Sequence, residues 1–150
     1  MPKKHYEIFF VSTLSSINKI KKSTKDVSFG QFVEDHNLFD GTLRRLQVIG
    51  DSIKNLLLSD FLQKEDPTWR DIVDFRNLVV HEYFSIDPEI IFRVVSTKIE
   101  DLEKNILAIM KQIPDKTYLL YALRDSRKVL KKMKRYDGAA YLEDIERDLI

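Results

Sequence analysis

Hydrophobic residues recur along most of the chain at spacings of three and four, which is the period of an α-helix with one buried face. One such stripe predicts a first helix over residues 4–22, and another predicts a helix over residues 39–63 that contains Gly50. A glycine inside a helix costs about 1 kcal/mol of helix propensity. We therefore expect Gly50 to lie where a second helix approaches closely.

Three sites carry the signals of a helix start. Ser28 can cap a short connecting helix, because its hydroxyl can accept a free backbone N–H. Asp66-Pro67 and Asp87-Pro88 each join a capping aspartate to a proline at the first helical position. We expect the helix that begins at Pro67 to end near Phe84. The helix that begins at Pro88 should continue without a break until Pro114 closes it.

The carboxy-terminal segment divides into two arms of opposite charge. Residues 116–136 hold eight Lys and Arg against one Asp, and residues 137–150 hold five acids against one Arg. The Asp137-Gly138 pair predicts a turn between the arms. The pattern favours a helical hairpin with paired arms that packs on itself or on the bundle, or that contacts a partner. Two alternatives are a partly disordered tail and an RNA contact through the basic residues Lys128, Lys131, Lys132 and Arg135.

Composition narrows the class of protein. The chain has 150 residues, 43% of them hydrophobic and 33% charged, with 4 Gly, 4 Pro and no Cys. We expect one compact all-α domain, residues 1–115, with residues 116–150 as an extension that is not independent. No apolar run approaches a membrane span, so we expect a cytoplasmic protein without a membrane contact. No residue cluster indicates a metal ion or a cofactor, and His5 and His36 are expected at the surface.

The stretch RNLVVHEY places four polar residues around three aliphatic ones. On a helix, Arg76 and Tyr83 nearly eclipse, and Asn77 and His81 stack about one third of a turn away, so the four share a broad face. Histidine can move a proton near neutral pH, and arginine presents a planar donor fork to phosphate. These groups suffice to cleave RNA without a metal ion, by attack of the 2′-hydroxyl on the adjacent phosphate.

The same residues also have structural interpretations. His81 taken alone is more often a hydrogen-bonded structural histidine than a catalytic one. Arg76 could form a salt bridge with Asp51 or Asp74. Tyr83 could be an ordinary half-buried tyrosine with its hydroxyl at the surface.

The chain resembles the HEPN domains, and among them the HepT-like toxins of MNT–HEPN toxin–antitoxin modules. The family motif R-x4-H-x-Y is present as Arg76, His81 and Tyr83, with the frequent asparagine as Asn77. PTWRDIVDFRNLVVHEYFSIDPEII resembles the family signature region. LRRLQVIGDSIKNL resembles its upstream helix, where relatives usually carry glutamates at the places of Gln47 and Asp51. The resemblance covers residues 6–113 and leaves the tail unmatched.

The resemblance implies an antiparallel helical bundle that dimerises so that motif helices from two protomers line one cleft. It implies a metal-independent endoribonuclease in which His81 transfers protons, Arg76 stabilises the phosphorane-like charge and Asn77 positions the histidine or the phosphate. It also implies a partner MNT nucleotidyltransferase that neutralises the toxin by transferring AMP to Tyr83. The alternatives are a non-catalytic module that docks a nucleotidyltransferase or nucleotide on this surface and, less favoured, a purely structural helical subunit.

Overall fold

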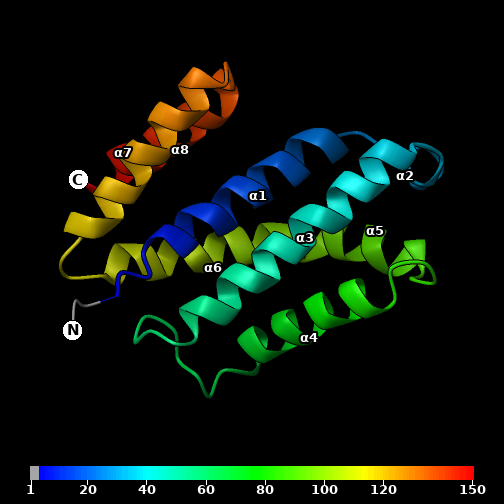
Figure 1. The fold of residues 1–150 in the computed structure, drawn as a ribbon, viewed down its shortest axis with the longest axis horizontal. Coiled ribbons are helices and arrows are strands. Elements are labelled where there is room, and N and C mark those ends of the chain that lie inside the picture. The colour runs from blue at the N-terminus through cyan, green and yellow to red at the C-terminus, as the bar shows by residue number, and fades with distance from the viewer. Residues whose placement is uncertain (1–3) are drawn as a thin grey trace.

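The computed structural model describes residues 4–150, and every regular element in that part of the chain is an α-helix (Figure 1). This confirms the predicted all-α class. None of these helices combines the length and the apolar composition needed to cross a membrane. The helices are α1 (Ile8–Thr24), α2 (Phe29–Glu34), α3 (His36–Leu56), α4 (Pro67–His81), α5 (Pro88–Thr97), α6 (Ile99–Gln112), α7 (Thr117–Lys132) and α8 (Tyr136–Leu149).

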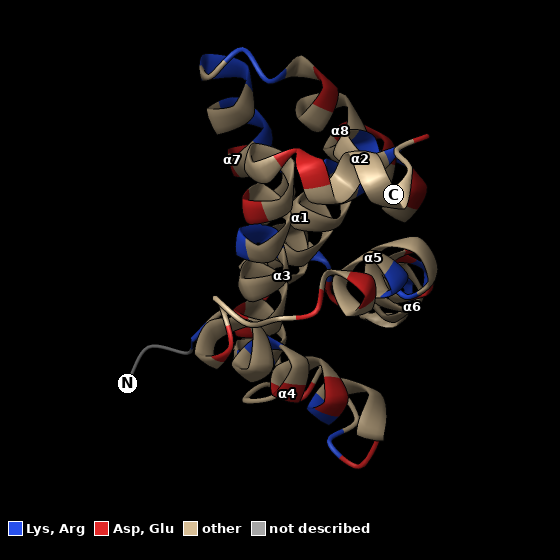
Figure 2. Ribbon diagram, turned by 90° about the vertical axis from the view of Figure 1, so that its right-hand side faces the viewer, with Lys and Arg blue, Asp and Glu red and all other residues tan. Residues whose placement is uncertain are grey.

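Helix α1 lies at the centre of the molecule. It contacts α3, α5 and α6 on the bundle side and both helices of the carboxy-terminal hairpin, α7 and α8. Its side chains Phe10, Leu14, Ile17 and Ile20 have no exposed surface, so the apolar stripe in the sequence is the core of the bundle. Helix α4 lies on the far side of α3 from α1 and the hairpin and packs mainly on α3 (Figures 1 and 2).

The three predicted capping signals are confirmed, whereas α1 begins at Ile8 instead of residue 4 and α3 begins at His36 instead of residue 39. Ser28 and Gln31 form a reciprocal capping box at the start of α2. The Asp66 carboxylate accepts the Thr68 N–H at 3.0 Å at the start of α4, and the Asp87 carboxylate accepts the Glu89 N–H at 2.9 Å at the start of α5.

The predicted helix ends are less accurate. Helix α3 ends at Leu56 instead of residue 63, because the following apolar residues fold back in a loop that covers the core. Helix α4 ends at His81, so Tyr83 and Phe84 lie in a turn beyond it. The helix predicted to run from Pro88 to Pro114 is interrupted at Lys98, where neither proline nor glycine marks the sequence.

The hairpin confirms the predicted pairing of its arms but not the predicted turn. Helix α8 already begins at Tyr136, so Asp137-Gly138 belongs to its first turn. The chain reverses instead at residues 133–135, where Lys134 has a φ of 57°. Between the arms, Arg124 and Arg127 bond the buried Glu146 carboxylate at 2.7 and 3.0 Å.

The hairpin is tied to the bundle by a short polar network. The Tyr141 hydroxyl on α8 donates to the Glu103 carboxylate on α6 at 2.7 Å, and Lys21 on α1 pairs with the other oxygen of Glu103 at 2.8 Å. Burial, followed by the hydrogen bond and the charge of Glu103, raises the pKa of the Tyr141 phenol. The Tyr141 hydroxyl therefore remains a donor throughout the neutral range.

Gly50 is the point at which α3 meets α4. A Cβ atom built on Gly50 would lie 2.5 Å from the Cγ of Arg76 and closer still to its Cβ. The Cβ of Arg76 is bonded directly to the backbone of α4 and cannot move aside unless the helix shifts. The predicted reason for a glycine at this position, close helix approach, is confirmed.

The variant Gly50→Ala should destabilise the fold, because the methyl group forces α3 and α4 apart. We expect a loss of about 1–3 kcal/mol in the free energy of unfolding, measured by urea denaturation. Gly41→Ala is the matched control on the same helix, since its Cβ would meet only the Arg45 guanidinium at 3.6 Å. That variant should gain up to about 1 kcal/mol of helix propensity. Equal effects of the two substitutions would contradict the proposed role of the crossing.

Candidate active site

Arg76 is held in place from two sides. Its Nε donates to the Asp51 carboxylate at 2.6 Å, and its Nη1 donates to the Asn77 side-chain carbonyl at 3.0 Å. The Arg76 side chain is 23% exposed. A guanidinium has five N–H groups, so three remain available for a phosphate. Of the two predicted salt-bridge partners, Asp51 is confirmed and Asp74 is not, because Asp74 lies 3.8 Å from Arg70 one turn earlier on α4.

Asn77 and His81 lie one helical turn apart on α4. The Asn77 carbonyl faces the Arg76 guanidinium, while its amide N–H groups bond to nothing within residues 4–150. His81 is the last residue of α4 and is exposed. Its ring makes no hydrogen bond or ion pair within the described chain, so the structural interpretation of a hydrogen-bonded histidine is not borne out there.

Tyr83 does not share the helical face as predicted, because α4 ends two residues before it. The tyrosine is 43% exposed, and its ring packs edge-on against Phe84 with centroids 5.2 Å apart. Its hydroxyl lies beside the Asp40 carboxylate on α3. The charge of Asp40, followed by desolvation and a hydrogen bond to the same carboxylate, raises the pKa of the Tyr83 phenol. The phenol is therefore protonated at neutral pH.

Helix α3 supplies the polar groups opposite the motif. Asp51 meets Arg76 and Asp40 meets Tyr83, and the two carboxylates lie eleven residues apart, close to three helical turns. Asp40 was not predicted from the sequence as a site residue. The eleven-residue spacing from Asp51 could have indicated it, because this spacing puts both carboxylates on the same face of α3. Gln47, at the other position where the family usually carries a glutamate, lies on α3 between them.

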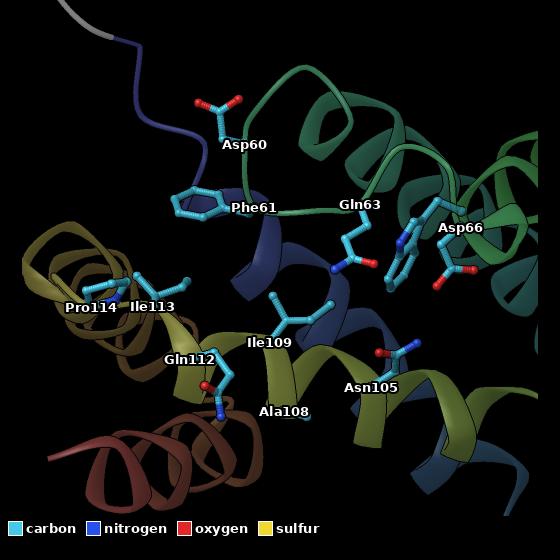
Figure 3. Close-up of a pocket in the computed structure, with 11 residues that line it drawn as sticks. Asp60, Phe61, Gln63, Asp66, Asn105, Ala108, Ile109, Gln112, Ile113 and Pro114 are labelled. Atoms are coloured by element: carbon cyan, nitrogen blue, oxygen red, sulfur yellow. The ribbon is translucent and has the colours of Figure 1, made fainter.

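The motif side chains do not line either of two cavities in the structure. A cavity of about 450 Å³ opens between the α3–α4 loop and the end of α6 (Figure 3). Its polar lining consists of carboxylates and amides, among them Asp60, Gln63 and Asn105, without histidine or arginine. A second cavity of about 530 Å³ lies between α3, α4, α5 and α6 and also excludes the motif. None of the four motif side chains lines either of these two cavities.

The basic residues predicted as RNA contacts are not brought to the motif. Lys128, Lys131 and Lys132 lie at the end of α7, and Arg135 lies in the turn that follows. This hairpin packs on α1, on the opposite side of the bundle from α4 (Figures 1 and 2). His5 and His36 are both exposed, as predicted. In the described chain no group of three or more His, Asp or Glu is placed to hold a metal ion.

Comparisons with known proteins agree with the motif. Residues 13–109 match the model of the family described as ribonuclease HepT-like. A Methanocaldococcus jannaschii protein named as a candidate RNase is 34% identical over 114 residues, which cover 75% of this chain and 93% of that protein. The probable ribonuclease HepT of Thermococcus cleftensis is 27% identical over 103 residues, covering 67% of this chain and 92% of that protein. No solved structure matches.

Proposed function

Because the chain belongs to the HepT-like ribonuclease family, a group of HEPN domains, we propose that it is an endoribonuclease that cleaves RNA without a metal ion. The observation that carries this proposal is the state of the two motif side chains on α4. Arg76 is oriented by Asp51 and Asn77 yet keeps three N–H groups, and the His81 ring is exposed and engaged by nothing within the described protomer.

The proposed reaction uses the RNA's own 2′-hydroxyl as the nucleophile. One His81 removes the hydroxyl proton while the 2′-oxygen attacks the adjacent phosphorus. Arg76 binds the non-bridging oxygens, where negative charge accumulates in the transition state. The bond to the 5′-oxygen then breaks, and an imidazolium returns a proton to the leaving oxygen. The products are a 2′,3′-cyclic phosphate and a 5′-hydroxyl. Asn77 acts by holding the guanidinium, and its free amide can bind the same phosphate.

We propose that the active unit is a homodimer, which supplies two His81 rings to one strand. Helix α4 packs mainly on α3 and leaves Leu78 and Val80 exposed, followed by Tyr83 and Phe84 in the turn. Phe84 is 99% exposed. An apolar patch beside a motif that faces open solvent fits an interface with a second copy of the chain.

We also propose that the protein is a toxin neutralised by a partner nucleotidyltransferase of the MNT type. In this step the Tyr83 oxygen attacks the α-phosphorus of ATP, pyrophosphate leaves, and the phenol proton is released. The raised pKa of Tyr83 means that the transferase must assist this deprotonation. The added AMP places a negative charge and bulk beside Arg76, where the RNA phosphate binds.

The alternative is a non-catalytic module that docks a nucleotidyltransferase or nucleotide on this surface. The ion pair between Arg76 and Asp51 favours it, because a carboxylate already neutralises part of the guanidinium charge. The two functions differ in whether His81 must exchange a proton, so a substitution of His81 separates them.

Wild-type protein should cleave RNA in excess chelator and leave 2′,3′-cyclic phosphate ends. His81→Ala should slow cleavage about 10²–10⁴-fold, because proton transfer is lost while the fold is kept. End-group analysis and gel assays measure both effects. His36→Ala is the matched control, an exposed histidine at the start of α3, and should cleave like wild type. If folded, unmodified wild-type protein binds RNA but does not cleave it, the non-catalytic binding module is favoured instead.

Phe84→Asp should convert the dimer to a monomer, because a charge replaces the most exposed side chain of the apolar patch formed by α4 and the turn that follows it. Sedimentation equilibrium measures the mass. Val129→Asp introduces the same charge at an exposed position on α7 and should leave the dimer intact. A wild-type monomer at micromolar concentration would contradict the proposed assembly.

Incubation with the cognate nucleotidyltransferase and ATP should add AMP mass to the wild-type chain. Tyr83→Phe should abolish the principal modification, because the acceptor oxygen is missing. Tyr136→Phe removes another exposed tyrosine hydroxyl and should be modified like wild type. Intact mass spectrometry reads all three proteins, and full modification of Tyr83→Phe would exclude Tyr83 as the acceptor.

A further inference from the structure

The outer face of α7 combines aromatic rings with lysines. Leu119 and Leu123 are fully buried on the inner face. The outer face presents Tyr118 and Tyr121 near its start and Lys128, Val129 and Lys132 toward its end, all of them exposed. Eleven residues separate Tyr121 from Lys132, which corresponds to roughly 17 Å along the helix.

The rings at the start of this face are exposed and already ordered. Tyr118 is 46% exposed and Tyr121 is 57% exposed. The Tyr118 ring stacks on His5, with centroids 3.6 Å apart and planes inclined by 19°, and Tyr121 lies 6.3 Å from Tyr118. The stack orients Tyr118 and covers one side of its ring. An exposed aromatic pair of this kind is able to stack on unpaired bases.

The lysines at the far end of the face have no acidic partner. Arg124 and Arg127 are engaged by acids of α8, whereas Lys128 and Lys132 form no ion pair within residues 4–150. Figure 2 shows the resulting concentration of basic residues at the end of α7 and in the turn beyond it. Arg135 in that turn is close enough to Lys19 on α1 to help lower its pKa, although burial contributes more. This end of the hairpin thus carries a local excess of positive charge.

We propose that the outer face of α7 is an accessory binding surface for single-stranded RNA, on which Tyr118 and Tyr121 stack bases and Lys128 and Lys132 bind phosphates. This inference rests on the proposed ribonuclease function and adds a second RNA-binding surface to it. The family match ends at residue 109, before α7, so the surface belongs to the part of the chain outside that match.

RNA fits this face better than a protein partner does. Neither of the two cavities described above includes this face, and its exposed tyrosines are followed along the helix by lysines without an ion pair in residues 4–150, a combination found on single-strand binding surfaces. Stacking on tyrosine accepts any base, because every base has a π face. One residue opposes RNA binding: the exposed Asp125 lies between Tyr121 and Lys128 on the same face. Its removal should therefore strengthen binding.

The test uses the full-length protein and a fluorescent, fully 2′-O-methylated RNA strand that cannot be cleaved. Tyr121→Leu should weaken binding at least about fivefold, because the apolar bulk remains but stacking is lost. Tyr121→Trp should restore wild-type affinity or exceed it, and Asp125→Asn should bind more tightly than wild type. Lys104→Ala on α6 is the matched control for the loss of one exposed lysine and should have no effect.

The salt dependence of binding separates phosphate binding from stacking. Lys128→Ala combined with Lys132→Ala should reduce the slope of log affinity against log salt by about 0.7 for each phosphate that the protein no longer neutralises, whereas Tyr121→Leu should leave the slope unchanged. Wild-type binding by all these variants would overturn the proposal. Loss of binding to the nucleotidyltransferase, with RNA binding intact, would identify a protein interface and would also overturn it.

The two proposals can fail separately, because the strand is resistant to cleavage. Impaired binding by the α7 variants with no RNA cleavage by wild type would keep the accessory surface and reject the ribonuclease. Wild-type binding by the α7 variants, together with RNA cleavage that depends on His81, would keep the ribonuclease and reject the accessory surface.

Discussion

The contact between Gly50 and Arg76 connects the fold to its chemistry. Helix α4 packs mainly on α3, so the position of its polar face depends on how closely these two helices approach. At the crossing, the glycine leaves room for the stem of Arg76, and the next residue, Asp51, accepts the guanidinium Nε. The same two positions thus set the distance between the helices and the direction of the arginine. An arginine with its stem packed and its Nε fixed loses little freedom when a phosphate binds to its remaining N–H groups.

Local signals in the sequence predicted how helices begin, but tertiary contacts decided where they end. The caps at Ser28, Asp66 and Asp87 depend on one side chain and the next few backbone N–H groups, so the sequence contains all that is needed. The end of α3 does not follow from local pattern. Phe61 continues the apolar stripe of that helix, yet it lies in a loop and packs against Phe10 on α1. Periodicity alone cannot distinguish a further helical turn from a loop that folds back onto the core.

The candidate site was predicted only in part, because some of its geometry is local to one helix and some depends on tertiary packing. Arg76, Asn77 and His81 lie within one helix, so their relative positions followed from helical geometry. Tyr83 was placed wrongly because α4 ends before it. Its neighbour Asp40 comes from α3, and this proximity depends on the packing of α4 against α3 and on the turn after α4. The aromatic face of α7 was missed because the exposure of Tyr118 and Tyr121 depends on which side of the hairpin packs on α1.

The distribution of charge gives the two surfaces different tasks. Around the motif, Asp51 pairs with Arg76 and Asp40 adds a second carboxylate beside Tyr83, so this region attracts a polyanion weakly. The net charge of +1 is too small to attract a polyanion to the molecule as a whole. The end of α7, in contrast, carries lysines without acidic partners in the described chain. Under the two proposals, the hairpin binds RNA and the motif on α4 cleaves it. Because the two surfaces lie on opposite sides of the bundle, only a strand long enough to pass around α1 and α3 reaches both. The hairpin would then favour long RNA over short fragments without any change at the catalytic residues.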